Sequence, residues 1–65
     1  NMEKRIVCID NKGLYLEQFT IEYNFEVKIK ITNKKEDAQE YVLEEVPKIL
    51  QILGVLGFSN NFAIE

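Results

Sequence analysis

Residues 21–31 read IEYNFEVKIKI, and apolar and polar side chains alternate along the whole stretch. A period of two places the apolar side chains on one face of a β-strand and the polar side chains on the other. At about 3.3 Å per residue, one strand of this length would reach roughly 35 Å, about twice the length of a common strand. The stretch therefore predicts a sheet with one buried face, and it places Tyr23 and Phe25 in the core.

A first strand is predicted before this stretch, at residues 3–9, where four consecutive apolar residues indicate a strand inside the sheet. The DNKG sequence at residues 10–13 is typical of a turn in which Gly13 adopts a positive φ. The first strand is therefore expected to form a hairpin with the chain that follows.

Residues 14–20 predict a second strand, which no turn signal separates from the alternating stretch. The apolar positions change parity near residues 17–18, so a bulge is expected there. We expect residues 14–32 to form one bent strand. A tight turn around residues 22–24 is the alternative, and the unbroken alternation argues against it.

The second half of the chain predicts one long helix. Apolar residues recur at helical spacing through residues 38–56, and Asn33 with Glu36 resembles a capping box. Pro47 interrupts the pattern, because it lacks a backbone donor and clashes with the preceding turn. We expect a kinked helix over residues 34–56, with two helices meeting at Pro47 as the alternative.

The predicted fold class is α+β, with the element order ββ(β)α. A small antiparallel sheet of two or three strands is covered on one face by the long Pro-kinked helix, which Gly57 ends. Residues 62–64 are expected to add a short C-terminal strand or a tail on the sheet. The single domain is expected to span residues 2–65, because Asn1 before Met2 resembles the remnant of an expression tag.

Size and composition narrow the range of functions. A chain of 65 residues buries only about 60 % of its unfolded surface, so its core is marginal and a partner would stabilise it. Eight basic and eleven acidic residues give a net charge of −3, which disfavours nucleic-acid binding. The longest mostly apolar stretch, residues 49–58, is too short to span a bilayer. With one cysteine and no export signal, we expect a cytoplasmic protein.

We expect no catalytic, metal or cofactor site. The chain has no histidine, so neither Cys8 nor Ser59 has an evident base. Cys8 is expected to be a buried apolar side chain. The carboxylates of Glu36, Glu40 and Glu44 lie at i,i+4 spacing, and we expect them to form a solvated helix face rather than a metal site.

Two patterns predict a partner. If the alternating strand pairs antiparallel with its own copy about a two-fold axis at Val27, Glu26 lies opposite Lys28 of the mate; alternatively these charges only keep the strand soluble. Three helical residues lie outside the main apolar stripe, so they need cover from the tail or from a second protein. The predicted interface residues are Glu26, Lys28, Leu43, Leu50 and Val55.

The sequence therefore predicts a non-enzymatic protein-interaction module that forms a homodimer and also binds another protein. We expect a small regulator or inhibitor, of the kind that phages and mobile elements encode, since the composition suits an AT-rich genome. One alternative is a small-ligand-binding module with a pocket between sheet and helix or at a dimer interface, lined by Tyr23, Tyr41 and Cys8. Another is an acidic nucleic-acid mimic, whose carboxylates are Glu36, Asp37, Glu40, Glu44 and Glu45.

Overall fold

The computed structural model describes residues 2–9, 13–58 and 61–65, and these residues form an α+β fold with two antiparallel sheets. The strands are β1 (Lys4–Arg5), β2 (Val7–Ile9), β3 (Leu14–Ile21), β4 (Val27–Thr32), β5 (Tyr41–Val42) and β6 (Phe62–Ile64). The helical elements are two 3₁₀ turns, η1 (Lys35–Asp37) and η2 (Leu43–Glu45), and the α-helix α1 (Val46–Val55). The predicted α+β class is confirmed, but the single sheet of two or three strands is wrong: the described residues form a four-stranded and a two-stranded sheet, because the short strands β5 and β6 add pairings between distant segments.

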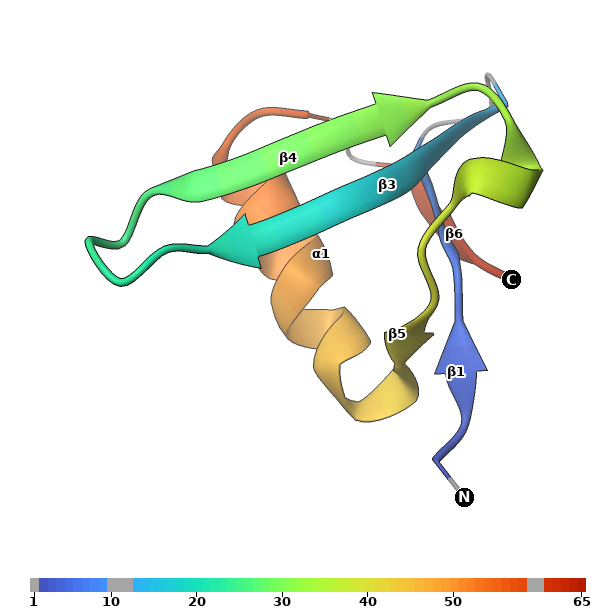
Figure 1. Ribbon diagram of the computed structural model, residues 1–65, viewed down its shortest axis with the longest axis horizontal. Helices are drawn as coiled ribbons and strands as arrows, with labels where there is room; N and C mark the ends of the chain where they lie inside the picture. Colours follow the sequence, from blue (N-terminus) through green and yellow to red (C-terminus); the bar gives the residue numbers. More distant parts are fainter. Residues whose placement is uncertain (1, 10–12, 59–60) are drawn as a thin grey trace.

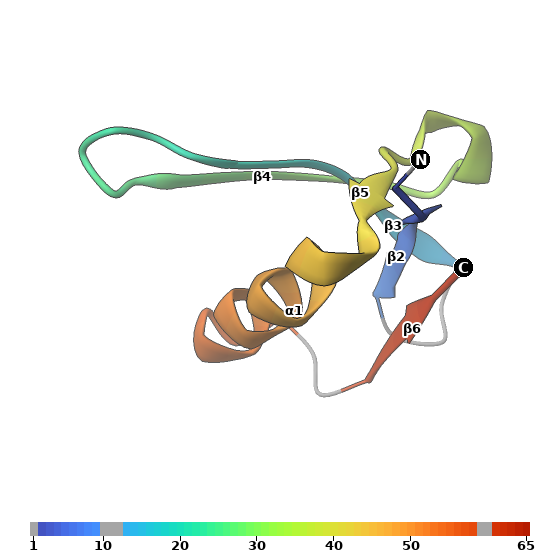
Figure 2. The same ribbon diagram turned by 90° about the horizontal axis from the view of Figure 1, so that it is seen from below.

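The larger sheet has the strand order β4-β3-β2-β6, and its neighbouring strands are all antiparallel (Figure 1). Figure 2 shows the long β3–β4 hairpin as one layer with α1 beneath it, while β2 and β6 turn down beside the helix. The smaller sheet joins β1 to β5 and continues the line of β2 past Ile6. The curved strands thus cover α1 from above and along one side.

The core lies between the inner face of the hairpin, β2 and α1. Because Leu16 pairs with Ile31 and Phe19 with Ile29, these apolar side chains share one face of the hairpin. The buried members of the core are Val7, Ile9, Leu16, Tyr41, Val46, Ile49 and Leu53. Burying one Val or Leu side chain contributes roughly 1.5–3 kcal/mol, so these few residues supply most of the hydrophobic stabilisation of the fold.

The alternating stretch forms the turn and second strand of a hairpin, so the prediction of one strand over residues 14–32 is wrong. The N–H of Glu22 donates to the C=O of Glu26 at 2.7 Å, and the N–H of Phe25 donates to the C=O of Glu22 at 2.9 Å. Phe25 has φ 67°, which breaks the extended backbone. The strands on either side of the turn, β3 and β4, pair their backbone groups within the chain, which the side-chain pattern does not reveal. The alternative, a turn near residues 22–24, is confirmed.

The turn also overturns the predicted core positions of Tyr23 and Phe25, whose side chains are 96 % and 87 % exposed. The predicted bulge is confirmed, because the β3–β4 register shifts between Leu16 and Gln18. The extra residue returns Leu16 and Phe19 to the same inner face, as the change of parity required.

The long Pro-kinked helix is wrong, because residues 34–45 form η1, β5 and η2, and α1 begins only at Val46. Pro47 lies in the first turn of α1, where its missing N–H removes no helical hydrogen bond. Proline therefore begins this helix instead of bending it, and the alternative of two helices meeting there is nearer to the structure. Asn33 is not the N-cap; Lys34 precedes η1, without a side-chain cap.

The predictions for the first strand, the last strand and the two turn glycines agree better with the structure. The predicted first strand is present as β1 and β2, and the predicted short strand at residues 62–64 is β6, paired with β2. Gly13 has φ 68°, as expected, while residues 10–12 of that turn lie outside the described residues. Gly57 (φ 82°) follows α1, where the N–H of Phe58 donates to the C=O of Leu53 at 3.1 Å, a Schellman ending.

Candidate functional site

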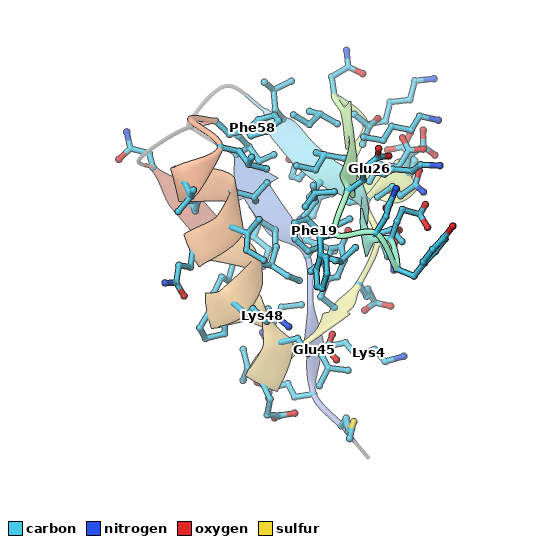
Figure 3. The ribbon with its side chains drawn as sticks, turned by 90° about the vertical axis from the view of Figure 1, so that its left-hand side faces the viewer. Lys4, Phe19, Glu26, Glu45, Lys48 and Phe58 are labelled. Carbon is cyan, nitrogen blue, oxygen red and sulfur yellow. The ribbon has the colours of Figure 1, made fainter. Side chains whose placement is uncertain are left out.

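At one end of the molecule the hairpin turn extends beyond α1 (Figures 1 and 2), and large exposed apolar side chains come from this turn and from the C-terminal end of α1. The turn supplies two almost fully exposed aromatic residues, and the end of α1 supplies Val55, which is 82 % exposed. Figure 3 looks onto this end, with Phe58 on the helix side and Glu26 on the hairpin side. The apolar end is defined by Ile21, Tyr23, Phe25, Val55, Leu56 and Phe58.

Phe25 is strained as well as exposed. Its φ of 67° lies in the left-handed region, where a side chain costs roughly 1–2 kcal/mol and glycine is usual. The N–H of Glu26 donates to Oδ1 of Asn24 at 3.2 Å, which helps to hold the turn in this conformation. The backbone conformation of Phe25 and the exposure of its ring both cost free energy and do not stabilise the isolated fold. Strained and exposed apolar positions of this kind concentrate at binding sites.

A hollow of about 320 Å³ lies beside the inner face of β3. In Figure 3, Phe19 lies between the hairpin and α1, with Lys48 and Glu45 below it. The residues that line the hollow are Phe19, Ile21, Gln39, Tyr41, Glu45, Lys48 and Ile49. Its wall is partly apolar and partly polar, since an amide, an acidic and a basic side chain lie beside the apolar residues.

Tyr41 is the one predicted ligand-pocket residue that lines this hollow. Its side chain is only 6 % exposed, its hydroxyl has no hydrogen-bond partner among the described residues, and burial raises its pKa to about 12. Tyr23 lies in the exposed turn, and Cys8 lies on β2, outside the hollow. The structure therefore does not bring the three predicted lining residues together.

The predicted charged interface pair lies at the hairpin. Glu26 is the exposed last residue of the turn, and Lys28 is exposed on β4, where its Nζ pairs with Oε1 of Glu22 at 3.2 Å. The proposed self-pairing about Val27 needed residues 22–32 to be extended, and residues 22–26 are the turn. That register is wrong for this reason, while an interface role for either charge stays a prediction.

The three predicted apolar interface residues differ in exposure. Leu50 lies on α1, packs against the core and is half-buried, so it is partly covered within the chain. Leu43 is half-buried in η2, and its N–H donates to the C=O of Glu3 at 2.9 Å. Val55 is the one of the three that is exposed, and it belongs to the apolar end.

The predicted acidic stripe is not helical, since Glu36 lies in η1, Glu40 before β5 and Glu44 in η2. All five carboxylates of the proposed nucleic-acid mimic are exposed.

In residues 2–9, 13–58 and 61–65, no group of three or more His, Cys, Asp or Glu side chains is placed to hold a metal ion. Nor does this part of the chain contain a helix with the length and apolar character needed to cross a membrane.

Cys8 is a buried side chain, as predicted, and it joins a small network with Glu65 and Lys35. Its Sγ donates to Oε2 of Glu65 at 3.0 Å, and Nζ of Lys35 lies 2.6 Å from Oε1 of the same carboxylate. Burial, followed by the carboxylate, raises the pKa of Cys8 to about 11, so the thiol is protonated at neutral pH. The hydrogen bond from Lys35 lowers the pKa of Glu65 below its ordinary value of 4.5.

Glu65→Gln is expected to make the thermal stability less sensitive to acid. Because the folded-state pKa of Glu65 is lowered, its carboxylate stabilises the fold above pH 4.5, and this contribution is lost as the pH falls through the folded-state pKa. Thermal unfolding at neutral pH and at acidic pH should give a smaller drop in Tm for the variant than for the wild type. Glu40→Gln, which removes an exposed carboxylate, serves as the control. An equal drop in Tm for all three proteins would contradict a role for this network.

The exposed aromatic turn was not predicted, and of the residues that line the hollow only Tyr41 was. The exposed aromatic turn depends on the chain reversal, for which Asn24 was the available signal, because asparagine is depleted in strands and tolerates turns. The hollow forms between β3, the segment before β5 and the start of α1, and no local pattern places these segments together.

No protein-family model matches the chain, and no curated protein or solved structure matches it either. The structural features that bear on function are therefore the apolar end, the hollow and the strand edges.

Proposed function

We propose that this chain is a non-enzymatic protein-interaction module that binds a partner protein through its apolar end. The observation that carries the proposal is Phe25, an aromatic side chain held outward in a left-handed backbone conformation. Tyr23, beside it, is exposed as well. Exposed aromatic residues on a loop between rigid strands are typical of the contacts that dominate binding energy.

The hairpin presents these aromatic residues on a stiff support. The two strands pair from Tyr15 with Thr32 to Ile21 with Val27. On the outer face, Nζ of Lys30 pairs with Oε2 of Glu17 at 3.1 Å, and a second ion pair lies near the turn. A preorganised turn loses little conformational freedom on binding, so more of the contact energy contributes to affinity.

The shape of the apolar end favours a partner with a cleft. A narrow projecting turn enters a concave surface more readily than it covers a flat one. When the turn occupies the cleft of a partner, other molecules cannot enter that cleft. This supports the narrower proposal of a small regulator or inhibitor.

The test is capture of binding partners by the immobilised protein and by the double variant Tyr23→Ser with Phe25→Ser. Each aromatic side chain is worth roughly 1.5–3 kcal/mol when buried, so losing both should weaken binding by at least about a hundredfold. Met2→Ser is the matched control, because Met2 is 70 % exposed and lies away from the turn. Circular dichroism checks that the variants fold. Equal capture by the wild type and the double variant would contradict the proposal.

The hollow beside β3 supports a second candidate, a module that binds a small ligand. Its volume of about 320 Å³ lies within the range of small-molecule sites, and it is lined by Tyr41, whose hydroxyl has no hydrogen-bond partner within the described part of the chain. This candidate ranks second because that hydroxyl is almost inaccessible, so a ligand could reach it only if the side chain moved. Saturation-transfer NMR with a set of small aromatic compounds tests it, and no binding by any compound would count against it.

A further inference from the structure

The second half of β3 has a free backbone edge. On the side away from β4, β2 pairs only with Leu14 and Tyr15, and the N–H of Gln39 donates to the C=O of Leu16 at 3.2 Å. Beyond that point no other described strand pairs with this side of β3, whereas β4 pairs along the opposite side as far as Ile21. Figure 1 shows β3 reaching well past the end of its contact with β2. Unpaired strand edges are ready templates for another strand.

The hydrogen-bonding groups of this edge follow from the hairpin. In antiparallel strands, residues that exchange backbone hydrogen bonds with the neighbour alternate with residues that do not. The N–H of Glu22 bonds to Glu26, so Thr20, two residues earlier, also directs its backbone groups toward β4. The N–H and C=O groups of Phe19 and Ile21 therefore point to the free edge.

We propose that a second copy of this chain pairs antiparallel with this edge, about a two-fold axis at Thr20. In that register Phe19 lies opposite Ile21 of the second copy, and these are the residues whose backbone groups face the edge. Thr20 lies opposite its own copy, and Gln18 lies opposite Glu22. Aromatic with β-branched, threonine with threonine, and amide with carboxylate are favourable cross-strand pairs, and a two-fold interface must be self-complementary in this way.

The hollow can accommodate the side chains that the second copy brings to the inner face of the sheet. Phe19 and Ile21 line the hollow on the inner face of β3. Residues directly opposite in paired strands point to the same face, so Ile21 of the second copy would lie next to Phe19, at the hollow. The two helices would then lie on the same side of one continuous sheet. The apolar part of the wall that is open in the single chain would be covered in the dimer.

The other long edge of the sheet is unsuited to the same pairing. β4 carries Lys28 and Lys30 on its outer face, and both are exposed. A two-fold axis at Ile29 sets one lysine opposite the other, and an axis at either lysine sets it opposite its own copy. Like charges directly opposite are destabilising, and lysine on an edge strand is a common barrier to pairing. The edge of β3 carries no such charge between Gln18 and Ile21.

The test uses two charged variants, Thr20→Glu and Thr20→Lys. The wild type is expected to sediment as a dimer at concentrations well above the micromolar range. Each variant alone should sediment as a monomer, because it meets its own charge at the axis. An equimolar mixture should recover a dimer of one Glu and one Lys chain. Thr32→Glu is the matched control on the opposite edge and should remain dimeric. Mutual rescue is expected only for a residue that lies opposite its own copy.

Amide hydrogen exchange gives a second readout without any substitution. The amides of Phe19 and Ile21 should be protected in concentrated solution and lose that protection on dilution, while the amide of Thr20, bonded to β4, stays protected throughout. A monomeric wild type, no rescue in the mixture, or unprotected Phe19 and Ile21 amides at high concentration would each overturn the inference.

This inference goes beyond the proposed function, since it concerns the free edge of β3 and not the aromatic turn. The two can fail separately: if the wild type is monomeric but the Tyr23 and Phe25 variant still loses its captured partner, only the dimer is overturned.

Discussion

Leu16→Ala is expected to remove a large part of the stability of the fold. Leu16 is fully buried at the bulge of β3, and it pairs with Ile31 above the helix. Removing a buried leucine side chain costs about 2–5 kcal/mol, through lost burial and the cavity left behind. Stabilities of roughly 0.05–0.15 kcal/mol per residue give a domain of this size only about 3–10 kcal/mol. The loss therefore equals a large part of the total free energy of unfolding.

Urea denaturation followed by circular dichroism measures this effect as a shift of the midpoint. Leu56→Ala is the control, because Leu56 is half exposed just after α1 and should cost far less. A similar midpoint for the two variants would contradict the position of the core between the hairpin and α1.

Phe25→Gly is expected to raise stability and lower binding at the same time. Glycine relieves a backbone cost of roughly 1–2 kcal/mol, while its greater freedom in the unfolded chain returns roughly 0.5–1 kcal/mol of that gain. The net change should be a gain of up to about 1.5 kcal/mol in the free energy of unfolding. The aromatic contact at the apolar end is lost, so partner capture should weaken by about tenfold or more.

Tyr23→Gly separates the two effects, because Tyr23 is exposed beside Phe25 without a positive φ. This variant should also lose binding, but it should show no gain in stability. If Phe25→Gly gained stability and kept full capture of the partner, the aromatic residue would not be retained for binding.

Sequence patterns were sufficient where one local rule decides the structure. The parity change near Glu17 predicted the bulge, and Gly57 predicted the end of the helix, where a positive φ is needed. The period of two also identified the inner face of the hairpin, so that Ile29 and Ile31 pack against the core. In each case the feature depends on residues close together in the chain.

Sequence patterns did not predict the structure where contacts between distant segments of the chain determine it. The alternation of residues 21–31 is equally consistent with a straight strand and with one that reverses, because side-chain parity says nothing about direction. Tyr41 fits a helical stripe by spacing, yet it lies on β5, which pairs with Arg5 of β1. That pairing joins residues far apart in sequence, and it prevents a helix before Pro47. The exposed aromatic turn and the hollow both follow from these two errors.

The position of β6 has a consequence for the order of folding. Residues 62–64 pair with residues 7–9, so this contact closes nearly the whole described chain. Contacts between residues so far apart in the sequence form late in folding. The β3–β4 hairpin joins two strands that are adjacent in the sequence, so it can form early. During synthesis, β2 would leave the ribosome long before the strand that pairs with its outer edge. In that interval Val7 and Ile9 have one neighbouring strand instead of two, which makes the N-terminal segment the part of the nascent chain most exposed to aggregation.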